Sequence, residues 1–237
     1  MHLADLDYLS INGKSIFHKA KSVSKVIFAV LIIASFILSH DIIKLGILLA
    51  VMVSLYILAG IPLGRIGHLA LYPAFFSMLF ALILSQGEWI VGLTIIFKAV
   101  GAALCMIFLL ATTPYTDLFS FLALFMPGLL TDVFLFTYRS LFIILDRAGN
   151  LIKIVRLRGG YSPSALLLNL TNAAKMLGVL ILHSFAMGER MYQVYRLRGY
   201  DSFIPLETDI WPLSRSDIIV IGLAAAMLLG AVMPWNL

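Results

Sequence analysis

The chain has 237 residues, of which 62% are hydrophobic and 12% are charged, and its mean hydropathy is +1.03. Soluble domains carry about 25% charged residues, because a surface that faces water must be covered with polar groups. The composition therefore excludes a soluble globular protein and predicts an integral membrane protein. The single cysteine, Cys105, excludes a disulfide framework and a multi-cysteine metal site.

Apolar stretches near the N-terminus approach the length of about 20 residues that a helix needs to cross a bilayer. They cover residues 26–39, 42–60, 66–85 and 89–111, and a fifth stretch covers 216–234. The first stretch has no cleavage-site pattern behind it, so we expect no removable signal segment.

A row of small residues marks the fifth stretch, where Gly222, Ala226 and Gly230 recur every four residues. Such a row can provide a face for close helix contact. It can equally reflect the high frequency of glycine and alanine in membrane helices, and the sequence leaves both readings open.

The segment 112–215 differs, because charges and helix breakers interrupt its apolar runs. Val133–Leu145 and Met176–Gly188 are each about thirteen residues long, which is too short to span a bilayer alone. Arg139 also lies inside the first run, and an arginine at mid-bilayer costs several kcal/mol. We therefore expect long amphipathic helices on one side of the membrane, in part embedded in it.

The basic residues indicate an orientation. If the N-terminus is cytoplasmic, the inner segments are 1–25, 61–65 and 112–215, and they contain 15 of the 17 basic residues. Lys44 then lies outside and Lys98 lies within the fourth span. This asymmetry follows the positive-inside rule. The sequence thus predicts four membrane helices in 1–111, a cytoplasmic or interfacial helical domain in 112–215, and a fifth membrane helix in 216–237.

Lys98 is the one formal charge deep in a predicted span, which makes it a functional hypothesis by default. The alternative is a lysine that reaches the interface or pairs within the helix bundle, with Glu88 as a candidate partner. Both readings stay open.

Motifs of enzymes are absent from the sequence. Gly13-Lys14-Ser15 lacks the glycine that a phosphate-binding loop needs earlier, because Tyr8 occupies that position. The five histidines lie far apart, and His40-Asp41 is more typical of a polar turn than of a metal site. We therefore expect no catalytic residue, no bound metal and no cofactor on this chain, and nothing in it suggests a nucleic-acid partner.

A tetrapeptide occurs twice, forty positions apart, as Arg156-Leu157-Arg158-Gly159 and Arg196-Leu197-Arg198-Gly199. Each copy ends a predicted helix, at 146–158 and at 165–198, and Ser162-Pro163 is expected to start the second helix as N-cap and first-turn proline. Glycine just past a helix end is typical of a cap, and arginine in the last turn suits the helix dipole.

Two identical copies favour docking to a partner over capping alone. A guanidinium is a planar, permanently charged group that binds carboxylates and backbone oxygens, and glycine allows close approach. Arg158 and Arg198 are the predicted docking residues, together with their glycines. Arg156 and Arg196 point roughly 200° away on the helix and have a lesser role. Two similar helix ends predict two similar binding sites, or sockets, on the partner.

An ordered set of landmarks surrounds these motifs: Thr112-Thr113-Pro114, Asp117-Leu118, Met126-Pro127, Tyr138-Arg139, Arg158-Gly159 and Arg198-Gly199. In order and spacing the set resembles the T component of energy-coupling factor transporters, which are ATP-driven importers of vitamins and of cobalt or nickel ions. Tyr138-Arg139 and the Asp5-x-Asp7 N-terminus are closer to the CbiQ-like cobalt and nickel branch. The family's usual signature has alanine before Arg-Gly, where this chain has leucine.

The resemblance implies a coupling subunit of the prokaryotic inner membrane. Its Arg-Gly ends would sit on two ATPase subunits, which hold ATP and magnesium, and a separate substrate-binding S component, CbiM-like for cobalt, would pack beside it among the lipids. The alternatives are the T component of a vitamin transporter and a conventional permease that lines its own substrate path.

Overall fold

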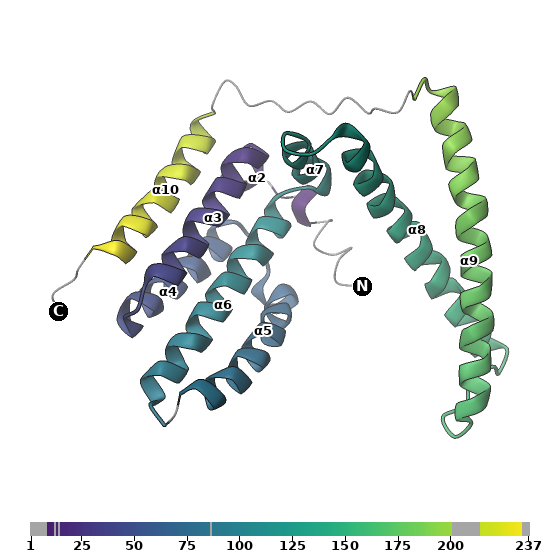
Figure 1. The fold of residues 1–237 in the computed structure, drawn as a ribbon, viewed down its shortest axis with the longest axis horizontal. Helices are drawn as coiled ribbons and strands as arrows, with labels where there is room; N and C mark the ends of the chain where they lie inside the picture. The colour runs from purple at the N-terminus through teal and green to yellow at the C-terminus, as the bar shows by residue number, and fades with distance from the viewer. Residues whose placement is uncertain (1–8, 12, 14, 86, 201–213, 234–237) are drawn as a thin grey trace. The chain divides into compact units, whose positions relative to one another are not determined.

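A computed structural model describes residues 9–11, 13, 15–85, 87–200 and 214–233. All regular structure in these residues is helical, and the predicted all-α membrane fold is confirmed. The chain divides into two compact units, Met1–Phe121 with Glu207–Leu237, and Leu122–Leu206 (Figure 1).

The helices of the first unit match the apolar stretches of the sequence. They are α2 (Ile16–Lys19), α3 (Ser22–Leu38), α4 (Ile42–Leu58), α5 (Leu63–Leu84), α6 (Trp89–Thr112) and α10 (Arg215–Val232), and α7 (Tyr115–Ala123) follows α6. By length and composition α6 and α10 can each cross a membrane, whereas α3, α4 and the apolar part of α5 are shorter. The five predicted spans therefore correspond to α3, α4, α5, α6 and α10.

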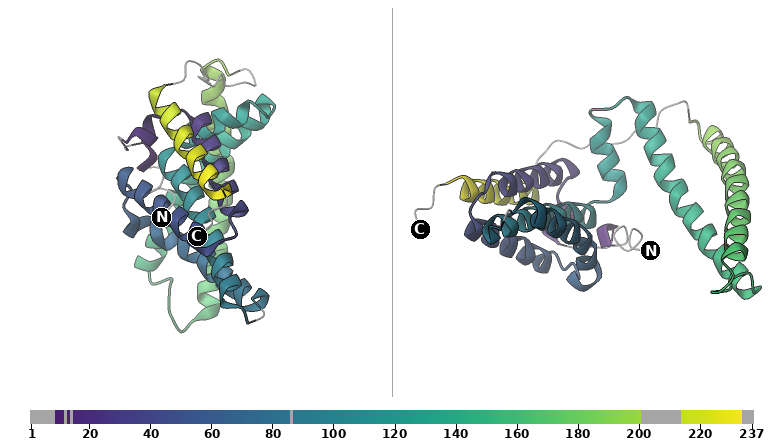
Figure 2. Two further views of the ribbon diagram at one scale, coloured as in Figure 1. Left: turned by 90° about the vertical axis from the view of Figure 1, so that its left-hand side faces the viewer. Right: turned by 60° about the horizontal axis from the view of Figure 1, so that its bottom comes forward.

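Helix α6 lies at the centre of the first unit, where it packs against α3, α4 and α5, and α10 packs against α3 (Figures 1 and 2). Phe108 of α6 is surrounded by the rings of Phe17, Phe28 and Tyr56, with centroid distances of 5.3, 5.9 and 5.2 Å. The buried Tyr56 hydroxyl donates a 2.6 Å hydrogen bond to the carbonyl oxygen of Leu104. Its polar group is thus paired inside an apolar core.

A single buried carboxylate joins the starts of α3 and α10. Oδ1 of Asp217 accepts a hydrogen bond from the backbone N–H of Lys21, and Oδ2 accepts one from the N–H of Ser214, both at 2.8 Å. Lys21 and Ser214 are the N-caps of the two helices. The N-terminal N–H groups of both helices, and the positive ends of their dipoles, meet at this point. One carboxylate therefore binds N–H groups of both helices and offsets the positive charge there.

The ammonium group of Lys25, in the first turns of α3, joins two further segments to this end of the bundle. Its side chain is buried and donates hydrogen bonds to the carbonyl oxygens of Thr112, at 2.8 Å, and His18, at 3.1 Å. Asp117 and Asp217 attract it electrostatically. The end of α6 and the segment that contains α2 are therefore fixed to the start of α3.

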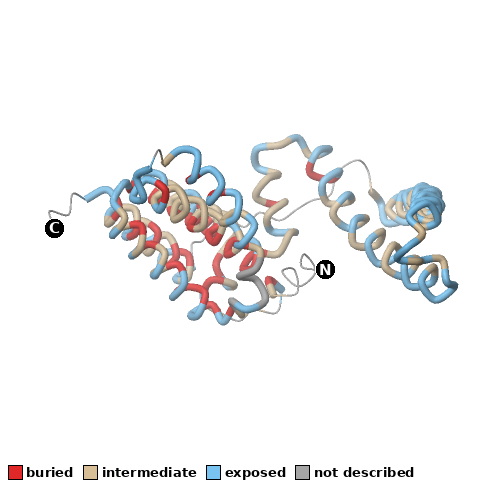
Figure 3. Tube along the Cα trace, turned by 90° about the horizontal axis from the view of Figure 1, so that it is seen from below, coloured by how far each residue is buried: buried red, intermediate tan, exposed pale blue. Residues whose placement is uncertain are grey.

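The second unit is an antiparallel pair of long helices, α8 (Gly128–Leu157) and α9 (Leu166–Leu197) (Figures 1 and 2). The apolar run Val133–Leu145 and the predicted helix 146–158 form one continuous helix of 30 residues. No residue of α9 is buried (Figure 3). By length and composition both helices could cross a membrane, so their placement on one side stays a prediction.

Replacing the buried carboxylate tests its role in the first unit. Asp217→Asn keeps the shape but leaves one acceptor oxygen for two N–H groups and removes the charge near Lys25. We expect the free energy of unfolding to fall by about 1–3 kcal/mol, seen as a lower thermal midpoint in detergent. The matched control Asp41→Asn changes a side chain that is 62% exposed and should leave the midpoint unchanged. Equal midpoints for all three proteins would contradict the assignment.

Candidate functional site

The two Arg-Gly motifs lie at the C-terminal ends of α8 and α9, as the sequence predicts. Arg158 and Arg198 are the C-cap residues of the two helices. Gly159 and Gly199 follow with φ of +71° and +81°, in the left-handed region that side chains disfavour. The glycine is therefore required by the backbone in both copies.

The backbone hydrogen bonds of the two helix ends are the same. The N–H of Gly159 donates to Arg156 at 3.1 Å, and the N–H of Gly160 donates to Val155 at 2.9 Å. In the second copy the N–H of Gly199 donates to Arg196 at 3.1 Å, and that of Tyr200 donates to Tyr195 at 2.9 Å. Both are Schellman motifs, which pair the last carbonyl groups of a helix. The chain thus presents the same local structure twice.

The side chains at both ends face away from the fold. All four arginines of the motifs are exposed. Leu157 is 87% exposed and Leu197 is 89% exposed, which is unusual for large apolar side chains even in this protein. Within the described part of the chain, the guanidinium groups of Arg158 and Arg198 make no hydrogen bond or ion pair. These groups are available to a partner.

Arg156 differs from the other arginines, because its guanidinium lies 5.5 Å from the centre of the Tyr161 ring. That distance is typical of a cation–π contact. The contact occupies Arg156 within the second unit, in agreement with the lesser role that the sequence analysis gives it.

Two asparagines close the loop between α8 and α9. Asn172 donates a 2.6 Å hydrogen bond to the carbonyl oxygen of Gly160. The side-chain amide of Asn169 accepts from the N–H of Ser162 at 3.0 Å and donates to its carbonyl oxygen at 2.6 Å. The prediction that Ser162 caps α9 is wrong, because the helix begins at Leu166 with Ala165 as its N-cap. The Ser162 backbone binds Asn169 instead.

An aromatic cluster supports the second Arg-Gly end. The rings of Phe136, Tyr195 and Tyr200 are in mutual contact, with centroid distances between 4.7 and 6.1 Å. The landmark Arg139 donates a 3.0 Å hydrogen bond to the Tyr195 hydroxyl. The Tyr200 hydroxyl donates to Oδ2 of Asp132 at 2.9 Å. Partial burial and this hydrogen bond raise the pKa of the Tyr200 hydroxyl.

These contacts place the two Arg-Gly ends at opposite ends of the helix pair. Asn172 near the start of α9 binds Gly160 after α8, whereas Tyr200 after α9 binds Asp132 near the start of α8. Helix α9 has 32 residues between the two ends. At a rise of 1.5 Å per residue it separates them by about 48 Å. The motifs therefore cannot bind one small site together.

Most of the remaining landmarks lie where helices begin or end, whereas Tyr138 lies within α8. Thr113 is the C-cap of α6 and is buried, and Pro114 accepts hydrogen bonds from the first turn of α7. Pro127 is the N-cap of α8. Tyr138 packs edge-on against Phe142, at a centroid distance of 5.0 Å, within α8. The structure thus places these landmarks at the connections of the fold and in α8.

Lys98 lies in α6, and its ammonium donates a 2.9 Å hydrogen bond to the carbonyl oxygen of Ile37 near the end of α3. This carbonyl belongs to the last turn of a helix, where such groups have no partner within the helix. The arrangement agrees with a lysine paired inside the bundle, although its acceptor is a backbone carbonyl in place of Glu88.

Several residues of the site were missed by the sequence analysis. Leu157 and Leu197 were noted only as departures from a family signature, and their alternation with arginine at helix ends could have indicated exposed anchors. Tyr195 and Tyr200 carry no local signal.

Within the described ranges, no group of three or more histidine, cysteine, aspartate or glutamate side chains could hold a metal ion.

Comparisons with known proteins agree with the landmarks. The family described as CbiQ, cobalt transport protein, matches residues 13–209, which include both Arg-Gly motifs. An uncharacterized protein, MJ1089, of Methanocaldococcus jannaschii is 29% identical over 172 residues, which cover 63% of this chain. The match spans 59% of that relative, so the chain covers less than two thirds of its length.

The family match extends over most of the chain, from the segment before α2 to the segment after α9. It confirms the resemblance on which the landmarks depend. Together with the apolar helices that could cross a membrane, it indicates a multi-pass membrane protein of a transport family. The chain belongs to the CbiQ family of cobalt transport proteins.

Proposed function

We propose that the chain is the coupling subunit of an ATP-driven importer of the energy-coupling factor type, with cobalt or nickel as its cargo. Its two Arg-Gly ends dock on two ATPase subunits, which bind ATP and magnesium. Helices α8 and α9 pass the motion of the ATPases to a separate substrate-binding membrane subunit. The observation that carries this proposal is the repetition of one exposed helix end, with the same hydrogen bonds and the same side chains.

The chemistry of each end suits a protein socket. Arg158 and Arg198 offer charged, planar donors for carboxylates or backbone oxygens. Leu157 and Leu197 offer apolar surface that water now covers and that docking would bury. An apolar anchor beside an arginine is a common arrangement of residues that dominate binding energy at interfaces.

The length of the helix pair limits how it can lie. If α8 and α9 crossed the bilayer, the ends that carry Arg158 and Arg198 would emerge on opposite sides of the membrane, because α9 alone is about 48 Å long. Both ATPases lie in the cytoplasm, where ATP is. The proposal therefore requires that the helix pair lies along the cytoplasmic face of the membrane.

Charge reversal at both ends tests the docking assignment. In the double variant Arg158→Glu and Arg198→Glu, repulsion replaces attraction in both sockets, so the ATPases should no longer co-purify with the chain from cells that express the whole transporter. The matched control, Arg147→Glu with Arg190→Glu, reverses two exposed arginines two or more turns before the ends of the same helices and should retain the ATPases. Normal ATPase recovery with the first variant would refute the assignment.

Truncation of the leucines tests the apolar anchors separately. Leu157→Ala and Leu197→Ala should each weaken ATPase binding by about tenfold, the loss expected for about 1.4 kcal/mol. Titration of the purified ATPase onto the chain in detergent measures the change. Leu182→Ala, at a leucine that is 73% exposed in the middle of α9, should leave the affinity unchanged. An affinity that responds to Arg158 and Arg198 but not to the leucines would limit docking to the arginines.

Cysteine labelling tests the side of the membrane on which both ends lie. The native Cys105 is buried, so a cysteine introduced by Ser164→Cys or Gln193→Cys can be labelled selectively. A membrane-impermeant maleimide should label both positions in inside-out vesicles and neither in intact cells. His40→Cys, on the predicted outer side, serves as the control with the reverse pattern. Labelling of Ser164→Cys and Gln193→Cys from opposite sides would show that the helices cross the membrane.

A further inference from the structure

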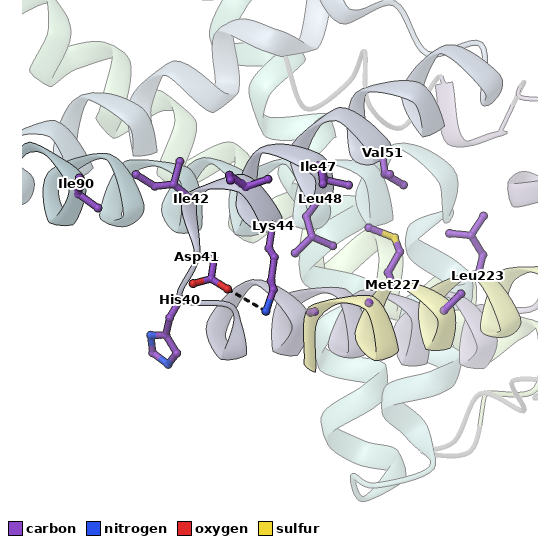
Figure 4. Close-up of a pocket in the computed structure, with 14 residues that line it drawn as sticks. His40, Asp41, Ile42, Lys44, Ile47, Leu48, Val51, Ile90, Leu223 and Met227 are labelled. Atoms are coloured by element: carbon purple, nitrogen blue, oxygen red, sulfur yellow. Dashed lines mark ion pairs between the residues drawn. The ribbon is translucent and has the colours of Figure 1, made fainter. Parts of the chain in front are cut away.

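A groove of about 770 Å³ lies between α4 and α10 in the first unit (Figure 4). Its walls are apolar, with Ile47 and Val51 from α4 and Leu223 and Met227 from α10. The helices that form it are among the apolar helices of the chain. The volume falls in the range of sites for small molecules, about 300–1,000 Å³.

Two small residues of α10, Ala226 and Gly230, line this groove. A Cβ atom built on Gly222 or Gly230 meets nothing within 4 Å, so these glycines make no close helix contact. Helix α10 packs against α3, and its buried residues include Val220 and Ala224. Within the described residues of this chain, neither glycine therefore forms a helix contact, and contact with a partner's helix stays a prediction. Gly230 lines the groove instead.

One end of the groove carries a pair of opposite charges. The ammonium of Lys44 lies 2.9 Å from Oδ2 of Asp41 and donates to the carbonyl oxygen of Met233 at 3.1 Å. The Lys44 side chain is 15% exposed, whereas that of Asp41 is 62% exposed. Lysine has three N–H donors, so one remains for a ligand in the groove. In Figure 4 Lys44 extends toward α10, and His40 points away from the groove.

The spans predicted from the sequence put this charged end at the depth of a membrane interface. It is formed by the start of α4 and the end of α10, and Ile90 at the start of α6 also lines the groove. The neighbouring Trp89 is 86% exposed, and exposed tryptophan at a helix end is typical of the headgroup region. In the predicted orientation this end faces the outer leaflet, opposite the end that holds Lys25.

We propose that the groove binds one phospholipid with a zwitterionic ethanolamine headgroup. An acyl chain lies along the apolar walls, the phosphate accepts a hydrogen bond from Lys44, and the headgroup ammonium pairs with the exposed carboxylate of Asp41. The net charge of the protein pair is zero, so it complements a headgroup that carries both signs. A purely anionic headgroup would satisfy Lys44 but would be repelled by Asp41, and a choline headgroup has no N–H to donate.

Lipid retention by the purified full-length chain tests the site. The chain in detergent is mixed with phosphatidylethanolamine, phosphatidylglycerol or phosphatidylcholine of the same acyl chains, and native mass spectrometry counts the bound lipids. We expect one retained phosphatidylethanolamine, held about tenfold more tightly than the other two, the factor that one hydrogen bond to a charged group supplies. Equal retention of the three lipids, or a preference for phosphatidylglycerol, would overturn the headgroup assignment.

Two variants separate the headgroup from the acyl chain. Lys44→Met should lower the retention of phosphatidylethanolamine about tenfold. Gly230→Leu should fill the groove and remove retention of all three lipids. The matched control Gly222→Leu adds the same side chain to the same helix outside the groove lining and should bind lipid normally. Lipid bound to Gly230→Leu as to the native chain, or a protein subunit that displaces the lipid in the assembled transporter, would overturn the site.

Discussion

The first unit depends on one buried carboxylate in a chain that has few charges. Asp217 binds the N-terminal N–H groups of α3 and α10 at once, and these helices lie far apart in the sequence. Removing such groups from water without partners costs free energy, and no other acceptor in the described residues serves Lys21. Lys25 extends the arrangement to Thr112, so the start of α3 fixes three segments in one place. Asp217 and Lys25 thus fix how the starts of α3 and α10 lie against each other, and the apolar contacts along these helices follow from that register.

The positions of the membrane helices could be predicted from hydropathy, because a span of apolar residues has few other uses. Helices α3, α4, α5, α6 and α10 correspond to the five apolar stretches of the sequence. The contact between Asp217 and Lys21 could not be predicted, because it joins residues 196 positions apart. The local pairing of Asp217 with Ser214 indicates only where α10 starts. The contact of Arg139 with Tyr195 was hidden for a related reason, because it joins α8 to α9 across 56 positions of the sequence.

The parts of the candidate site that consist of consecutive residues could be predicted from the sequence. The parts that depend on contacts between helices could not. The repeated motif predicted both helix ends, because the glycine cap and the last-turn arginine are close neighbours in the sequence. Ser162-Pro163 has the composition of a helix start. In the structure the side chain of Asn169 binds the Ser162 backbone, and the helix begins only at Leu166. The cluster of Tyr195, Tyr200 and Phe136 requires the antiparallel arrangement of α8 and α9, which no single stretch of sequence contains.

The separation of the two Arg-Gly ends has a mechanical consequence. A hydrogen-bonded helix has a fixed rise per residue, so α9 behaves as a strut that can neither shorten nor lengthen. Two sockets that grip its opposite ends cannot move toward each other along its axis. If ATP draws the sockets together, the strut can respond only by rotating. A linear approach of two subunits in the cytoplasm would thereby become an angular displacement of a rigid element beside the membrane.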